Sequence, residues 1–189
     1  MTPMADHDAN RSMSAVWGGS FVPGDVVRVL AAVSVLVGTW RSGAVATALF
    51  LLVLGGTMVP RVIGLPAVLD VAYCSTVLLA AWAAQLDWYV AVGSLDLVMH
   101  ALATGLIAVV ALRALQVWGA VGAEPSRGER AVIVVGIGAV SAELWELGEW
   151  AGNAFLDRRI QVGYVDTVGD LTAALLGSVV AAVIVARRS

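Results

Sequence analysis

Six apolar segments follow one another along this chain, and they limit its fold more than any other feature. They cover about residues 26–40, 43–59, 66–86, 94–118, 130–150 and 165–186. A helix needs about 20 mostly apolar residues to cross a bilayer, and helices satisfy their own backbone hydrogen bonds in lipid. The chain is 60% hydrophobic and 13% charged, far more apolar than soluble domains. We therefore predict an all-α, polytopic membrane protein with six transmembrane helices.

The polar and breaking residues between these segments indicate how the chain is organised. Residues 1–24 are polar and lack the apolar core of a signal peptide, so we expect a disordered cytoplasmic tail. Residues 25–189 then form one six-helix transmembrane domain. Only residues 41–43 separate the first two segments, which predicts a tight helical hairpin. The linker over residues 119–129 is the clearest break.

The arginines predict the orientation of the helices in the membrane. All eleven basic residues are arginines, so chemistry that needs a lysine Schiff base is excluded. With the N-terminus in the cytoplasm, seven arginines fall inside and three outside, which favours an N-in/C-in topology. The seven are Arg11, Arg28, Arg61, Arg127, Arg130, Arg187 and Arg188, and the three are Arg41, Arg158 and Arg159. The net charge of −3 gives no sign of nucleic-acid binding.

Acidic residues within the apolar segments are the strongest indication of a site. Half of the fourteen acids lie there: Asp70, Asp96, Glu143, Glu146, Glu149, Asp166 and Asp170. An acid at the centre of a transmembrane helix costs roughly 2.5–3.5 kcal/mol on insertion scales, so such residues are functional candidates. Under the predicted topology, all but Asp70 lie beside His100 in one layer in the outer leaflet. We expect Asp70, at the inner end of its helix, to cap or pair locally.

Carboxylates with one imidazole suit a divalent ion such as Mg²⁺, Mn²⁺, Fe²⁺ or Zn²⁺. The predicted metal ligands are His100, Glu146, Asp166 and Asp170, with Asp96 as a further ligand or as the residue that orients His100. Either Glu143 or Glu149 would serve as the general base. The Glu-x-x-His pairs of di-iron bundles are absent. Alternatively, the same side chains form a polar core that only holds the helices together, or pair with Arg158 and Arg159.

Small residues recur every four positions on the last three helices, which predicts close helix packing. They are Gly169, Ala173 and Gly177 on the sixth helix, Gly148 and Gly152 on the fifth, and Ala101 and Gly105 on the fourth. We expect Trp145 and Trp150 to anchor the fifth helix at the membrane interface. The single Cys74 has no partner for a disulfide and is expected to pack in the apolar core.

Three segments carry a resemblance to a known family. They run from Asp96 to His100, from Glu143 to Trp150, and from Asp166 to Asp170, and Gly177 follows them. Together they resemble the YjdF-type family of bacterial inner-membrane proteins over roughly residues 90–186. The resemblance implies that the acids and His100 form a shared site, and it implies no activity. A weaker similarity links the chain to VanZ-like membrane proteins, although Asp170 stands where those carry an amide.

Three hypotheses about function remain open at this stage. The first is a metal-dependent membrane enzyme that acts on a lipid or lipid-linked substrate at the outer leaflet. The second is a proton- or cation-coupled transporter, which would need polar residues on both sides of the membrane, whereas only Asp70 lies toward the other side. The third is a non-catalytic membrane partner that stabilises or regulates another protein.

Overall fold

The computed structural model describes residues 21–187, and these residues form seven helices and no strand. The helices are α2 (Gly24–Ser42), α3 (Ala44–Val62), α4 (Ala67–Gln85), α5 (Trp88–Ala91), α6 (Gly93–Val117), α7 (Arg127–Phe155) and α8 (Tyr164–Arg187). The all-α prediction is confirmed for this part of the chain. The predicted tail lies outside the described residues up to position 20, and its last residue, Gly24, already begins α2.

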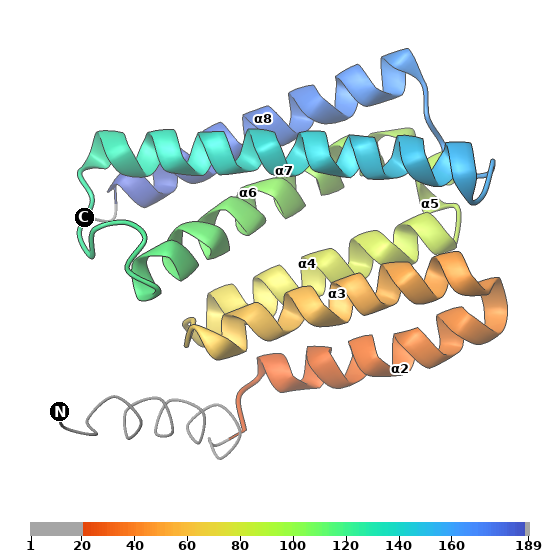
Figure 1. The fold of residues 1–189 in the computed structure, drawn as a ribbon, viewed down its shortest axis with the longest axis horizontal. Helices are drawn as coiled ribbons and strands as arrows, with labels where there is room; N and C mark the ends of the chain where they lie inside the picture. The colour runs from red at the N-terminus through yellow and green to blue at the C-terminus, as the bar shows by residue number, and fades with distance from the viewer. Residues whose placement is uncertain (1–20, 188–189) are drawn as a thin grey trace, which may run out of the picture.

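The long helices run up and down in two groups of three (Figure 1). The first group is α2, α3 and α4, which pack around Phe50, Val53 and Cys74. The second group is α6, α7 and α8, whose core contains Val134 and Ala182. The turn between α2 and α3, the short α5 and the connection between α7 and α8 lie at one end of the molecule. The other connections and both ends of the described chain lie at the opposite end.

Five of the helices are long and apolar enough to cross a membrane, namely α3, α4, α6, α7 and α8. Helix α2 has 19 residues but carries Asp25, Arg28 and Arg41, and it does not meet the same criterion. Length and composition therefore identify five membrane-crossing helices among the described residues, one fewer than the sequence analysis predicts.

Local sequence explains where the helices begin and end. Gly43 alone separates α2 from α3, and its φ of 74° is a conformation that favours glycine, so the predicted tight hairpin is confirmed. Helix α7 begins earlier than predicted because Ser126 and Glu129 form a capping box. The turn of helix α5 is an unpredicted element.

Helices α6 and α8 approach each other through their backbones. A Cβ atom on Gly177 would lie 2.7 Å from the Ala101 Cα, and one on Gly105 would lie 2.9 Å from the Gly177 carbonyl oxygen. The predicted close packing is confirmed at these positions. It is wrong for Gly148, which is exposed with open space around it. On α7 the close contact is made instead by Gly138, against Ser178.

A buried ion pair connects the helices of the first group. Arg28 and Asp70 are 6% and 3% exposed, and the guanidinium donates to both Asp70 oxygens at 3.2 and 2.6 Å. The Arg28 Nε also donates to the Thr57 carbonyl at 2.8 Å. Asp70 therefore pairs with a residue 42 positions away, not locally as predicted. Cys74 is fully buried beside it, with Sγ 3.3 Å from the Asp70 Oδ1.

Candidate metal site at one end of the second helix group

Asp96, His100 and Asp170 form the centre of the predicted layer. Asp96 and His100 lie one turn apart on α6, and Asp170 faces them from α8. The His100 Nε2 is 3.4 Å from the Asp96 Oδ1 and 3.9 Å from the Asp170 Oδ1. One donor atom from each residue lies within 4.8 Å of the other two. Asp170 is only 2% exposed, while Asp96 and His100 are half-buried.

Glu146 extends this group from the third helix of the bundle, α7. Its carboxylate interacts electrostatically with His100, Asp96 and Asp166, and it contacts the side chain of Thr167. One carboxylate oxygen, Oε1, is buried and has no hydrogen-bond partner within residues 21–187. A buried acceptor without a partner is costly, so this oxygen is poised to accept a proton or bind a cation.

Glu149 lies one turn further along α7 and belongs to the same electrostatic group. It interacts with Glu146, His100 and Asp96, and its carboxylate contacts Trp145. Trp145 therefore has a polar role beyond the predicted interfacial anchoring.

Tyr89 on α5 also faces the group, and sequence reasoning missed it. It interacts electrostatically with Asp96, Glu149 and Asp170, and its hydroxyl donates to the Ala80 carbonyl at 3.0 Å. Its position in an aromatic stretch directly before α6 was the only available signal.

The two remaining candidates differ in their surroundings. Asp166 lies in the first turn of α8 and interacts electrostatically with Asp96 and His100, so it forms the edge of the cluster. Glu143 is exposed on α7 and makes no hydrogen bond or ion pair with any described residue. The structure brings together Asp96, His100, Glu146, Glu149, Asp166 and Asp170, and it leaves Glu143 outside.

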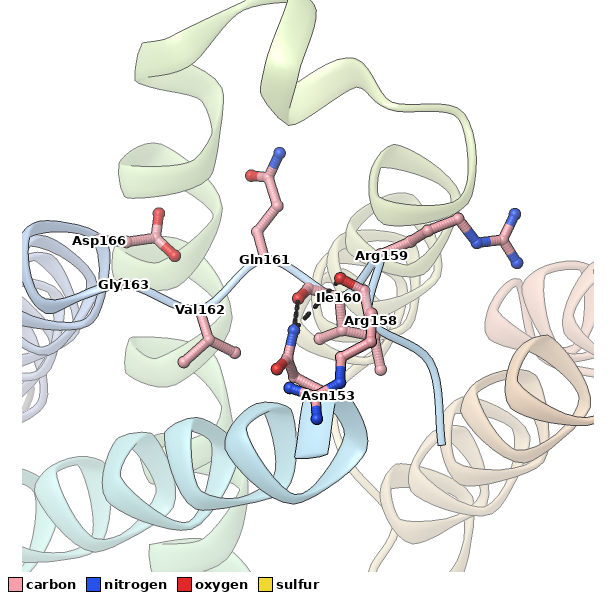
Figure 2. A pocket seen from close by; sticks show the side chains of 8 residues that line it. All are labelled: Asn153, Arg158, Arg159, Ile160, Gln161, Val162, Gly163 and Asp166. Carbon is pink, nitrogen blue, oxygen red and sulfur yellow. Dashed lines mark hydrogen bonds between the residues drawn. The ribbon is translucent and has the colours of Figure 1, made fainter. Parts of the chain in front are cut away.

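A hollow of about 380 Å³ opens beside Asp166, at the connection between α7 and α8 (Figure 2). Asn153 fixes this connection to the end of α7, because its amide donates to the carbonyls of Arg158 and Ile160 at 3.3 and 2.6 Å. Arg159 pairs with Asp157 at 2.8 Å, and the hydrogen bond from this guanidinium holds the pKa of Asp157 below its usual range. Neither Arg158 nor Arg159 forms an ion pair with the acids of the cluster within residues 21–187.

Comparison with known proteins gives a family and no characterised relative. Residues 25–189 match the family described as "Predicted membrane protein (DUF2238)". The match includes the first two helices, which the resemblance noted from the sequence leaves out. No curated protein and no solved structure matches the chain.

Proposed function

This chain belongs to the DUF2238 family of predicted membrane proteins, the YjdF-type family, and from that premise we propose that it binds a divalent metal ion within the bilayer. The site lies in the outer leaflet of a bacterial inner membrane and acts on a lipid or lipid-linked substrate. The carboxylate and histidine cluster of α6, α7 and α8 is the metal site.

One observation carries the proposal: the donor atoms of Asp96, His100 and Asp170 lie within 4.8 Å of one another. Two ligands at about 2.0–2.2 Å from a tetrahedral ion lie about 3.4 Å apart. The separations of 3.4 and 3.9 Å from the His100 Nε2 to the two aspartates are close to that value. Glu146 is the fourth ligand in this proposal because its Oε1 is buried without a hydrogen-bond partner among the described residues, although the group of donor atoms within 4.8 Å comprises only Asp96, His100 and Asp170.

The surrounding side chains have separate roles in this proposal. A bound divalent ion supplies a Lewis acid and activates water. Glu149 is the better candidate for the general base because it interacts with the cluster. Glu143 stays a prediction in that role, since it is exposed and touches none of the ligands. Asp166 lies where a substrate would reach the metal from the hollow.

We propose that α2 also crosses the membrane, which gives six crossings. Its most deeply buried charge, Arg28, is neutralised by Asp70, which reduces the cost of placing it in lipid. The antiparallel packing of α2 on α3 supports this. With an N-in/C-in orientation, the cluster lies on the same side as Arg41, Arg158 and Arg159, in the outer leaflet. Most of the other arginines then lie inside.

The ion pair also argues against transport across the membrane. Asp70 is the acid that would continue a cation pathway toward the other side. Its two oxygens accept hydrogen bonds from Arg28, and the resulting pair is neutral.

The experiment is a measurement of Mn²⁺ binding to the detergent-purified protein, by calorimetry and elemental mass spectrometry. We expect about one equivalent in the wild type. Asp170→Asn removes a buried ligand, so it should weaken binding by about a hundredfold or more. Glu143→Gln is the matched control, because it neutralises one carboxylate outside the cluster, and its affinity should stay within about twofold of the wild type.

Two outcomes would contradict the metal site. Absence of bound Mn²⁺, Fe²⁺, Zn²⁺ and Mg²⁺ in folded wild-type protein would leave a polar core that holds the helices together. Equal losses in Asp170→Asn and Glu143→Gln would mean that the ion binds through general negative charge.

A further inference from the structure

The hollow at the connection between α7 and α8 presents a positively charged side chain to an incoming ligand. Arg158 lines it together with Asn153, Gln161 and Asp166. The Arg158 guanidinium makes no hydrogen bond or ion pair with any residue of the described range 21–187. Its neighbour Arg159 is held by both oxygens of Asp157, and Figure 2 shows it reaching away from the other lining side chains. Of the two arginines, Arg158 is therefore the one available to a ligand.

The backbone that carries Arg158 is fixed by hydrogen bonds. The Asn153 amide holds the carbonyls of Arg158 and Ile160, so the backbone that carries the guanidinium is tied to α7. Asp166 lines the same hollow and interacts electrostatically with Asp96 and His100. A ligand of headgroup size in the hollow thus lies between an arginine and the acidic cluster.

The charges determine which ligand fits. Five carboxylates with one imidazole repel an anion when the cluster is empty. A divalent ion offsets that negative charge and adds a coordination position for an oxygen ligand. Arginine binds phosphate through two parallel N–H···O hydrogen bonds. The combination of a metal on one side and a free arginine on the other selects a phosphate group, because it has oxygens for both.

We propose that this hollow binds a phosphate group, from a lipid headgroup or as free phosphate, between Arg158 and the metal ion of the neighbouring cluster. This inference rests on the metal site proposed above. It adds the substrate class, and it makes phosphate binding dependent on the metal.

The experiment uses full-length protein in dodecyl maltoside, with and without Mn²⁺. Calorimetry measures binding of dihexanoyl phosphatidic acid, of inorganic phosphate and of dihexanoylglycerol, which lacks phosphate. We expect Mn²⁺-loaded protein to bind a phosphate-bearing probe at least about tenfold more tightly than the metal-free protein. Arg158→Gln should weaken this binding by about tenfold or more while Mn²⁺ affinity stays within about twofold. Arg159→Gln, one residue away and already paired, should change it by no more than about twofold.

Each result then has one meaning. Binding of the phosphatidic acid but not of inorganic phosphate identifies a lipid headgroup site, and the reverse identifies a free-phosphate site; both support the proposal. It is overturned by equal losses in Arg158→Gln and Arg159→Gln, by equally tight binding of dihexanoylglycerol, or by binding that ignores Mn²⁺. Mn²⁺ binding without phosphate binding overturns this inference alone, whereas no Mn²⁺ binding overturns the metal site as well.

Discussion

At the scale of single residues, the molecule contains two buried polar centres with opposite chemistry. In the first, the Arg28 guanidinium donates hydrogen bonds to the Asp70 carboxylate and to the Thr57 carbonyl. In the second, acids outnumber the single imidazole and the Glu146 Oε1 has no partner among the described residues. A neutral, satisfied pair holds helices together, while an unsatisfied negative cluster is the one with capacity for a ligand.

The ion pair gives a prediction about stability. Asp70→Asn leaves the buried Arg28 guanidinium with only the part-buried Asp25 as a counter-charge, and breaking a buried pair costs about 3–5 kcal/mol. We expect a strongly lowered melting temperature in detergent. The double variant Arg28→Met, Asp70→Leu removes both charges, so it should recover most of the loss. A double variant as unstable as Asp70→Asn would show that the charges themselves are required.

Glu143 gives a second prediction, because its carboxylate is exposed on a membrane-spanning helix without a partner in the described chain. Placing such an acid in the membrane costs roughly 2.5–3.5 kcal/mol at a helix centre, and Glu143→Leu removes this cost. We expect a higher melting temperature and unchanged Mn²⁺ binding. A lower melting temperature would instead show that Glu143 contacts a group outside residues 21–187, such as a second protein.

Sequence alone predicted the members of the acidic cluster better than their partners. A spacing of four residues puts Asp96 with His100 and Asp166 with Asp170 on one helix face, and the structure brings both pairs together. It failed for Asp70, because a pairing with a residue 42 positions away depends on how α2 packs against α4. Sequence also could not distinguish Glu143 from Glu146. Which of the two glutamates faces the cluster depends on where α8 packs against α7.

At the scale of helices, the contact between α6 and α8 sets the geometry of the site. Gly177 lies two turns after Asp170, and Ala101 directly follows His100. Their backbones meet without intervening side chains, so the separation of the two ligand-bearing helices is set by main-chain contact. Interiors packed in this way respond to small changes in volume.

Gly177→Ala tests this contact. Its Cβ would collide with the Ala101 backbone, which should cost about 1–3 kcal/mol as an overpacked position and weaken Mn²⁺ binding. Gly148→Ala makes the same chemical change where no atom lies within 4 Å, so stability should be retained or slightly raised. Equal effects of the two substitutions, read from melting temperature and Mn²⁺ titration, would contradict the role of the contact.

The helices themselves were predictable because apolar length is a direct consequence of bilayer thickness. Six observed helices correspond to the six predicted segments, with ends shifted by a few residues. The unpredicted α5 is a single turn of four residues after Asp87, which adopts a left-handed conformation. So short an element has no periodicity to detect.

At the scale of the whole molecule, the proposed topology predicts which connections face which side. A Cys74→Ala background removes the only native thiol, and Ser42→Cys, Gln161→Cys and Gly122→Cys add one each at connections. An impermeant maleimide applied to intact cells should label positions 42 and 161 and leave 122 unlabelled, since the α2–α3 turn and the α7–α8 connection lie at one end of the molecule and the α6–α7 connection lies at the other. Labelling of 122 instead would place the cluster at the inner leaflet. Labelling of both 42 and 122 would contradict the proposed topology, because α3, α4 and α6 lie between these positions and three crossings would place them on opposite sides.

The separation of the chain into two helix groups has a consequence for synthesis. Arg28 is made early, but its counter-charge on α4 follows 42 residues later. At about 5–20 residues per second, that interval lasts roughly 2–8 s. During this time the counter-charge of Arg28 within its own helix is Asp25, 3.1 Å away, and the buried pair with Asp70 cannot form until α4 emerges from the ribosome. We therefore expect the ion pairs of the first group to be completed when its third helix arrives, before the half that carries the acidic cluster is synthesised.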